Sequence, residues 1–132
     1  MDYFSLNLPT EYLNQVPNLS LAHVGDAVFE LMVRAMLAAS IKESVQSQHK
    51  KTVKLVAAPA QARAAEIIIP VLTEEELKVF NRGRNTKVNS VPHAATVKEY
   101  HEATALETLF GYLYLCGRKD RLSELFGMMM EE

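Results

Sequence analysis

Two acidic residues, Asp26 and Glu107, interrupt segments that are otherwise strongly apolar. Each has a glycine nearby, since Gly25 directly precedes Asp26 and Gly111 lies one helical turn after Glu107. A carboxylate near a protein core is costly unless it finds a cation or becomes protonated. Two carboxylates are enough for Mg²⁺, which prefers oxygen ligands and keeps several waters. The pattern therefore indicates a shared metal site or, alternatively, an Asp26 ion pair with a basic side chain and a Glu107 hydrogen bond between helices.

Small residues surround both acids. Glycine inside a helix is unfavourable by about 1 kcal/mol relative to alanine, so another factor must favour Gly25. A glycine lets a second backbone or a ligand approach closely. Ala22 precedes Asp26 by one helical turn, and Thr104 precedes Glu107 in the same way. We therefore expect clear space in front of each carboxylate.

Other polar groupings favour simpler roles. Glu30 follows Asp26 by one turn, but Arg34 lies one turn further on, which favours a surface ion pair over a third metal ligand. No adjacent His-Asp pair occurs, and no local arrangement indicates a Ser-His-Asp triad. The histidines also lack the spacing typical of zinc sites; they are His23, His49, His93 and His101.

Positive charge is concentrated in clusters. Fourteen basic and sixteen acidic residues give a formal charge of −2, which provides no overall case for a nucleic-acid partner. Each cluster is either a solvated helix end or part of a binding surface. The clusters are His49, Lys50, Lys51 and Lys54, then Arg82, Arg84 and Lys87, and finally Arg118, Lys119 and Arg121.

The apolar pattern predicts helices along the whole chain. The first long helix should cover residues 20–39, with Ser20 as its N-cap. A second apolar pattern stops near Pro59, whose fixed φ suits the first turn of another helix that Pro70 ends. No alternating pattern is long enough to build a sheet. We expect an all-α helical bundle that forms one domain, residues 1–132.

Local signals divide the second half of the chain. The spacing Thr-x-x-Glu of a capping box occurs twice and predicts helices over about 73–80 and 96–116. Gly83 and Gly117 should end these two helices. Between them, residues 82–93 are rich in Gly, Pro, Ser and Asn, which predicts an irregular, exposed basic loop. A last amphipathic helix completes the chain.

The composition favours the cytoplasm. No segment approaches the roughly 18 consecutive apolar residues that are needed to cross a bilayer. The start of the chain carries Asp2 and Glu11 and shows no basic leader. Cys116 is the only cysteine, so a disulfide within the chain and a cysteine-based zinc site are excluded. We expect a cytoplasmic protein that does not bind membranes.

Two segments resemble the signature of the ribonuclease III family. The segment LAHVGDAVFELMVR, residues 21–34, resembles the family helix that carries Leu-Gly-Asp-Ala-Val, with Asp26 at the signature aspartate. The segment TALETLFGYLYL, residues 104–115, resembles the second acidic helix of the family, with Glu107 before an apolar run and a glycine. The two motifs in the correct order are much more specific than either acid alone.

The closer likeness is to Mini-ribonuclease III, the short branch that has the catalytic domain without a double-stranded-RNA-binding domain. Ala22 and Thr104 stand where full-length family members carry two further acids, and the short branch also tends to lack them. His101 follows Tyr100 where the short branch commonly has arginine, so we transfer no role to it. The basic RGRN loop of the branch is matched by Arg82, Gly83, Arg84 and Asn85, followed by Lys87.

The resemblance implies an all-α ribonuclease III-type domain that acts as a homodimer and cleaves double-stranded RNA, leaving 5′-phosphate and 3′-hydroxyl ends. Asp26 and Glu107 would be the catalytic metal ligands, with Mg²⁺ as the cofactor and Mn²⁺ able to replace it. The short branch is associated with maturation of large-subunit (23S) ribosomal RNA precursors, which are the expected substrate. The residues expected to bind RNA are Arg82, Arg84, Asn85 and Lys87, and less strongly Lys50 and Lys51.

Alternatives to this interpretation follow from the same residues. The acids absent at Ala22 and Thr104 would also suit a catalytically silent helical RNA-binding or ribosome-assembly module. A helical metal phosphohydrolase that acts on nucleotides is less well supported, because its His-Asp ligands are absent. One apolar stripe is either a source of dimer contacts or internal core; it consists of Leu109, Phe110, Leu113 and Tyr114.

Overall fold

Helices form the ordered framework of the molecule. The structure is a computed structural model and describes residues 1–40, 42–87, 91 and 95–131. No strand occurs in these ranges, so the predicted all-α fold is confirmed. In chain order the elements are α1 (Thr10–Leu13), α2 (Asn18–Ala39), α3 (Val45–Leu55), α4 (Ala58–Ile68), the 3-10 helix η1 (Ile69–Val71), α5 (Glu74–Arg84), α6 (Val97–Leu115) and α7 (Lys119–Met130).

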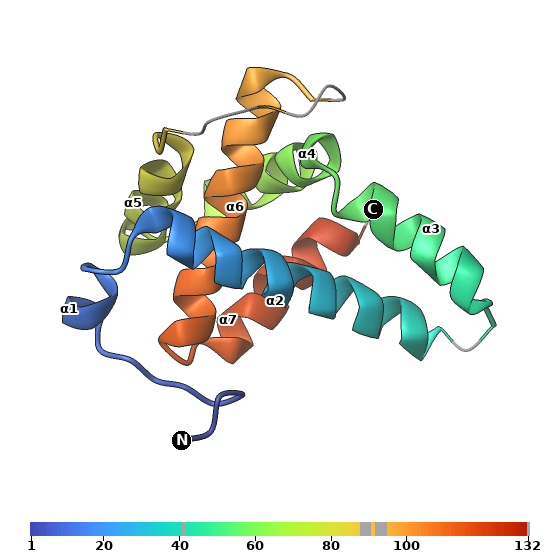
Figure 1. Ribbon diagram of the computed structural model, residues 1–132, viewed down its shortest axis with the longest axis horizontal. Coiled ribbons are helices and arrows are strands. Elements are labelled where there is room, and N and C mark those ends of the chain that lie inside the picture. Colours follow the sequence, from blue (N-terminus) through green and yellow to red (C-terminus); the bar gives the residue numbers. More distant parts are fainter. Residues whose placement is uncertain (41, 88–90, 92–94, 132) are drawn as a thin grey trace.

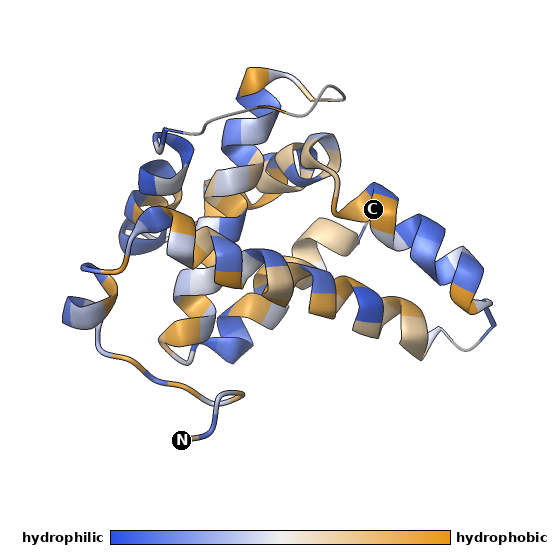
Figure 2. Cartoon of the chain, in the orientation of Figure 1, coloured by the Kyte–Doolittle hydropathy of each residue, from blue (hydrophilic) through white to orange (hydrophobic). Residues whose placement is uncertain are grey.

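The central helix is α6. Helices α2, α4 and α5 all pack against it, and Figure 1 shows α2 crossing α6 with α5 beside it. Because neighbours cover α6 on several sides, Leu106, Leu109 and Phe110 have no exposed surface. Hydrophilic residues instead dominate α3 and α5, at the two sides of the view in Figure 2. None of the described helices combines the length and apolar character that a membrane span requires.

Helices α2 and α6 touch backbone to backbone at Gly25 and Gly111. A Cβ atom on Gly25 would lie 1.6 Å from the carbonyl oxygen of Glu107, and one on Gly111 would lie 1.9 Å from the carbonyl oxygen of Leu21. Both distances are far shorter than a van der Waals contact, and the obstructing atoms belong to the backbone. Any larger residue at either position would therefore push the helices apart, which accounts for glycine in a helix interior.

Several helix ends lie where the sequence predicts them. Thr73 caps α5 and Thr96 caps α6, each in a complete capping box with the glutamate three residues later. Gly117 follows α6 with a φ of +80°, and the amide of Arg118 donates to the carbonyl of Leu113 at 2.8 Å. This is the Schellman arrangement, in which glycine is preferred because the backbone is left-handed.

The first half of the chain departs from the prediction in small ways. Helix α2 begins at Asn18, so Ser20 lies inside the helix and Pro17 occupies the N-cap position. Proline has a fixed φ and no amide hydrogen, and both properties suit a helix start. Pro70 does not end α4 directly but lies in η1. The sequence pattern also does not predict α1, because four residues carry too little periodicity.

Helix α5 extends further than its sequence pattern predicts. It continues through Gly83 to Arg84, because Gly83 packs against α6, where a Cβ atom would lie 2.5 Å from the Thr108 hydroxyl oxygen. The predicted irregular loop over residues 82–93 is therefore wrong for its first three residues. Within that loop, residues 88–90 and 92–94 lie outside the part of the chain that the structure describes.

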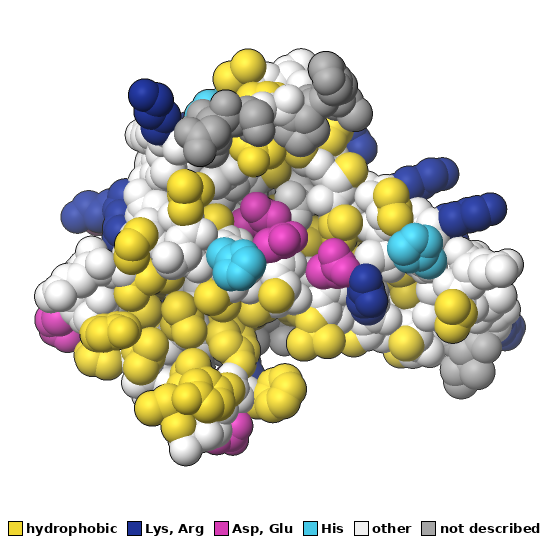
Figure 3. Space-filling model, in the orientation of Figure 1, with side chains coloured by type: hydrophobic (Ala, Val, Ile, Leu, Met, Phe, Trp, Pro, Cys, Tyr) yellow, Lys and Arg dark blue, Asp and Glu magenta, His cyan; other side chains and the backbone are white. Residues whose placement is uncertain are grey.

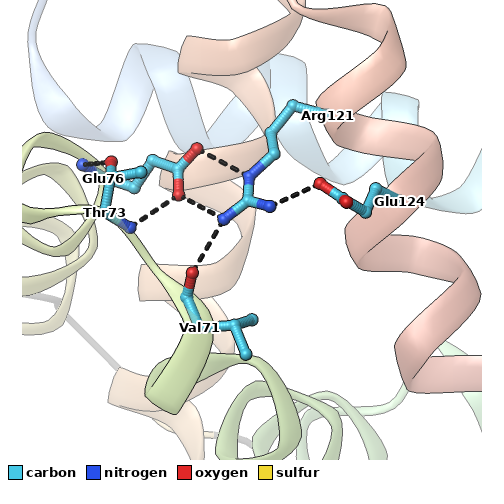
Figure 4. A network of polar contacts seen from close by, with 5 residues as sticks. All are labelled: Val71, Thr73, Glu76, Arg121 and Glu124. Atoms are coloured by element: carbon cyan, nitrogen blue, oxygen red, sulfur yellow. Dashed lines mark hydrogen bonds and ion pairs between the residues drawn. The ribbon is translucent and has the colours of Figure 1, made fainter.

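A buried ion pair joins α7 to the start of α5 (Figure 4). The Arg121 guanidinium donates from Nε and Nη2 to the two carboxylate oxygens of Glu76, each at 2.9 Å. Nη2 also donates to the Val71 carbonyl at 2.9 Å, and Nη1 pairs with Glu124. Glu76 in turn accepts from the Thr73 amide and so completes the capping box. The Arg121 guanidinium therefore links α7 to both α5 and η1.

This environment makes Glu76 more acidic than an ordinary glutamate, although it is only 3% exposed. Burial raises the pKa of Glu76, but hydrogen bonds from Arg121 and the Thr73 amide, together with the charges of Arg121 and Arg118, lower it by more. A carboxyl group with a lowered pKa stabilises the fold above its unfolded-state pKa. That stabilisation is lost as the pH falls through the lowered value.

We predict that Arg121→Ala lowers the free energy of unfolding by about 3 kcal/mol at neutral pH, because Glu76 is left charged and buried without its partner. The difference from the parent protein should shrink as the pH falls from about 4.3 through the lowered pKa of Glu76. Urea denaturation at neutral and acidic pH measures both effects.

Arg34→Ala is the matched control, because it removes the exposed pair with Glu30 on α2. This variant should lower the free energy of unfolding by less than about 0.5 kcal/mol. Equal losses in the two variants would contradict the role assigned to Arg121.

Candidate active site

The two acids named from the sequence lie at the crossing of α2 and α6. Asp26 is exposed on α2, and Glu107 is partly buried on α6. The backbone carbonyl of Glu107 occupies the space in which Gly25 would carry a Cβ atom. Because Gly25 directly precedes Asp26, the two acidic residues are neighbours across this contact despite their separation in sequence.

Glu107 is a strongly perturbed carboxyl group. Burial and the adjacent negative charge of Asp26 raise the pKa of Glu107 to about 8, whereas the amide of Gln61 acts in the opposite direction. Two neighbouring carboxylates resist ionising together, so at neutral pH the pair retains a proton. A cation that replaced this proton would allow both groups to carry their charge.

No basic side chain neutralises this pair. In the described ranges, neither Asp26 nor Glu107 takes part in an ion pair. The alternative of an Asp26 ion pair with a basic side chain is therefore not supported. Glu30 pairs with Arg34 at 2.5 Å on the surface, in agreement with the sequence interpretation. Glu30 is accordingly not available as a third ligand in this arrangement.

The donors at the crossing fit Mg²⁺. Among the residues with described positions, no group of three or more His, Cys, Asp or Glu could hold a metal ion. Mg²⁺ takes oxygen ligands and retains several waters, so two carboxylates are sufficient protein ligation. The raised pKa of Glu107 shows that positive charge between the acids would be favourable.

The small residues beside the acids have a packing role. Ala22 and Thr104 are each only 6% exposed, so they do not create the clear space expected in front of the carboxylates. The Thr104 hydroxyl donates to the Tyr100 carbonyl of its own helix at 3.0 Å. Neither position adds a negative charge, so the site has two acids, without the two further acids that the sequence resemblance associates with Ala22 and Thr104.

Gln61 is a polar residue near the acids that the sequence interpretation missed. It lies on α4, which packs against α6, and it is 2% exposed. Its amide is close enough to Glu107 to favour the charged form of that carboxyl. A signal was present in the sequence, because Gln61 shares a helix face with Ala65 and Ile68, which are buried. A polar side chain on a buried face is informative.

The basic residues at the end of α5 divide into two kinds. Arg84, Asn85 and Lys87 are exposed and line a shallow pocket of about 410 Å³. Arg82 is only half exposed, and its Nη2 donates to the Asn18 side-chain oxygen at 2.8 Å. Arg82 therefore ties the end of α5 to the start of α2, whereas the other three face solvent.

The second basic cluster lies on α3. Lys50 and Lys51 are both exposed, and Lys51 forms an ion pair with Glu43. In Figure 3 most basic side chains lie around the edge of the view, while acidic side chains gather near its centre. On the face shown, acidic side chains thus lie near the centre and basic side chains around them.

An apolar groove adjoins Asp26. It has a volume of about 680 Å³ and is formed by one face of α2 together with α7 and the N-terminal segment. Leu31 is 57% exposed on α2, and Phe4 is 72% exposed on the N-terminal segment. Figure 3 shows a broad apolar area below the acidic centre. Large apolar side chains that are exposed next to one another make this groove a candidate interaction site.

The apolar stripe of α6, in contrast, is mostly internal. Three of its four members have no exposed surface, so they belong to the core and cannot contact a second molecule. Only Tyr114 reaches the groove beside Asp26. The three core residues are Leu109, Phe110 and Leu113.

Comparison with known proteins gives one consistent result. Residues 19–118 match the Ribonuclease III domain family. The chain is 42% identical over 119 residues to a Mini-ribonuclease 3 of Clostridium tetani, which covers 89% of this chain and 79% of that protein. A Mini-ribonuclease 3 of Thermosynechococcus vestitus is 36% identical over 124 residues, or 94% and 80% of the two chains. A crystal structure of a protein from Fusobacterium nucleatum has a TM-score of 0.81 at 29% identity, covering 89% and 93%.

We predict that the metal-free protein loses stability as the pH rises towards 8. The raised pKa of Glu107, about 8, favours the protonated form in the folded state. This stabilisation is complete below the unfolded-state pKa of about 4.3 and is lost as the pH rises through the folded-state value. The loss should approach 1.4 kcal/mol for each pH unit in this interval.

Denaturation in the presence of a chelator, across this pH interval, measures the effect as the difference between the parent and Glu107→Gln. Glu30→Gln serves as the control acid on α2 and should behave like the parent. A Glu107→Gln variant with the same pH dependence as the parent would rule out this titration.

Proposed function

Because this chain belongs to the ribonuclease III family, in its Mini-ribonuclease 3 branch, we propose that it cuts double-stranded RNA in a Mg²⁺-dependent reaction. Membership of the family makes it an endoribonuclease, a hydrolase that acts on RNA. The observation that carries the proposed mechanism is the meeting of Asp26 and Glu107 at the crossing of α2 and α6. We further propose that it acts in the cytoplasm on the precursor of large-subunit ribosomal RNA.

Asp26 and Glu107 would hold the ion. When bound, Mg²⁺ supplies Lewis acidity, which polarises a phosphodiester and makes an attacking water more acidic. The exposed Asp26 can reach toward the substrate, and the partly buried Glu107 gives up its proton as the cation is taken up. The expected products have 5′-phosphate and 3′-hydroxyl ends, and Mn²⁺ should replace Mg²⁺.

The basic periphery suits a duplex substrate. Double-stranded RNA is bound mainly through its shape, backbone and 2′-hydroxyls rather than through base edges. Arg84, Asn85 and Lys87 are the first candidates for phosphate contacts, because they are exposed at the end of α5. Lys50 and Lys51 on α3 are weaker candidates, since Glu43 already pairs with Lys51. Arg82 would act by holding the end of α5 in place.

A second copy of the chain would cover the apolar groove. The groove lies on α2 next to Asp26, so a symmetric dimer formed there would bring two acidic pairs to one side of the assembly. Two sites arranged in this way could each cut one strand of a duplex. Leu31 lines the groove and is 57% exposed, so it should contribute strongly to this contact.

The cleavage reaction tests the proposed function. We predict that Asp26→Asn and Glu107→Gln each reduce Mg²⁺-dependent cleavage of duplex RNA at least about 100-fold, which corresponds to a loss of about 2.7 kcal/mol of transition-state stabilisation. Glu30→Gln, one turn away on the same helix, should retain activity. If the parent binds duplex RNA but shows no metal-dependent scission, the chain is instead an RNA-binding or ribosome-assembly module.

Salt-dependent binding tests the proposed RNA surface. We predict that Arg84→Ala weakens binding of duplex RNA and lowers the slope of log affinity against log salt by about 1, because one phosphate contact is lost. Lys78→Ala, an exposed lysine elsewhere on α5, should leave the slope unchanged. Equal slopes for the parent and Arg84→Ala at unchanged affinity would exclude this contact.

The oligomeric state tests the proposed dimer. We predict that Leu31→Glu converts a dimer into a monomer in analytical ultracentrifugation, because a charge would be buried in an apolar interface. Val53→Glu on α3 is the control, since Val53 is 53% exposed, close to the 57% of Leu31. The groove is not the dimer contact if both variants sediment like the parent.

A further inference from the structure

Gln61 carries a buried amide group that lacks a hydrogen-bond partner. Its Nε2 atom is inaccessible to solvent and meets no acceptor among the described residues. The other buried positions of α4 are alanines and one isoleucine. An apolar side chain of similar size would avoid the cost of removing this amide from water. Packing alone therefore does not account for glutamine here.

Glu107 offers the acceptor that this amide needs. Gln61 lies on α4, which packs against α6, and its amide counteracts the rise in the pKa of Glu107, which places the two groups near each other although Nε2 makes no hydrogen bond within the described residues. Asp26 approaches Glu107 from α2. A carboxylate has two oxygens, each with two lone pairs, so Glu107 can accept from one side and bind a cation on the other. Hydrogen bonds to an ionised carboxylate are about twice as strong as those between neutral groups.

We propose that Gln61 is a positioning residue for the metal site. Its Nε2–H donates to one carboxylate oxygen of Glu107 when the site holds a divalent cation, and the other oxygen is thereby held toward Asp26. This inference rests on the proposed function and deepens it. Groups that orient metal ligands in this way typically change metal affinity about 10- to 100-fold.

The small number of ligands makes this orientation important. No third acidic, cysteine or histidine ligand accompanies the pair within the described residues. A rotation of either carboxylate would therefore remove a large share of the protein ligation. Gln61 is well suited to prevent such a rotation, because it is fixed by the packing of α4 on α6 and lies on a helix rather than a loop.

The experiment measures Mn²⁺ binding to the RNA-free protein by electron paramagnetic resonance. Gln61→Met keeps the length of the side chain and removes the donor, and Gln61→Leu removes the donor with a shorter, branched side chain. Both variants should bind Mn²⁺ about 10- to 100-fold more weakly than the parent. Without metal, their melting temperatures should equal or exceed that of the parent, because an unsatisfied amide has been removed.

Cleavage kinetics separate positioning from a structural role. The Mg²⁺ concentration for half-maximal cleavage should rise by the same factor as the Mn²⁺ dissociation constant. The rate at saturating Mg²⁺ should return to within about threefold of the parent, since the ligands themselves are intact. Thr52→Val is the control, because Thr52 is also buried but hydrogen-bonds within α3; its Mn²⁺ affinity should match the parent.

Three results would overturn the proposal. Mn²⁺ affinities of both Gln61 variants within about twofold of the parent would show that the amide does not orient Glu107. Failure of both variants to fold without metal would assign Gln61 a structural role. A parent protein that binds no Mn²⁺ would remove both this inference and the proposed mechanism.

The proposed function and the positioning role of Gln61 can still fail separately. A parent whose Mn²⁺ affinity depends on Gln61 but which cuts no RNA would leave the positioning role intact and contradict the proposed function. A parent that binds Mn²⁺ and cuts RNA, with Gln61 variants that do the same at equal metal concentrations, would contradict only the positioning role.

Discussion

Direct contact between the backbones of α2 and α6 determines where the two acids lie. Without a side chain at Gly25, the carbonyl of Glu107 packs directly against the backbone of α2, and Asp26 follows immediately on that helix. The same closeness brings two like charges together in a partly desolvated place, and it raises the pKa of Glu107 to about 8. The described chain offers no basic side chain that would relieve this repulsion. The proposed cation site is thus a consequence of how tightly two helices pack.

Much of the fold could be predicted because its signals are local. The caps at Thr73 and Thr96 and the stop at Gly117 depend on hydrogen bonds within a few residues. The two acids could be recognised as candidates, because carboxylates seldom interrupt apolar helices. Their meeting could not be derived in the same way, since no local rule states which helices cross. That step required the likeness of two motifs to a known family, which the comparisons bear out at the level of the domain.

Features that depend on neighbours from other helices were the ones that sequence reasoning missed. Gly83 has the form of a helix stop, but the residue that requires its small size is Thr108 on α6. In the sequence, Arg82 cannot be distinguished from the basic residues around it. Its hydrogen bond to Asn18 is known only from the fold. Gln61 shares a helix face with apolar residues, but the helix that covers this face, α6, is known only from the fold. In each case the residue type was informative, but its partner was known only after folding.

The bond between α5 and the start of α2 has a mechanical consequence. Asn18 contacts both Arg82 and Thr86, and it begins the helix on which Asp26 lies. Roughly two turns separate these positions, or about 12 Å along the helix axis. The first two turns of α2 therefore hold the end of α5 at a fixed distance from Asp26. A duplex whose backbone binds at Arg84, as proposed, would lie at a constant distance from the two acids. This distance would select the bond to be cut without any contact to a base.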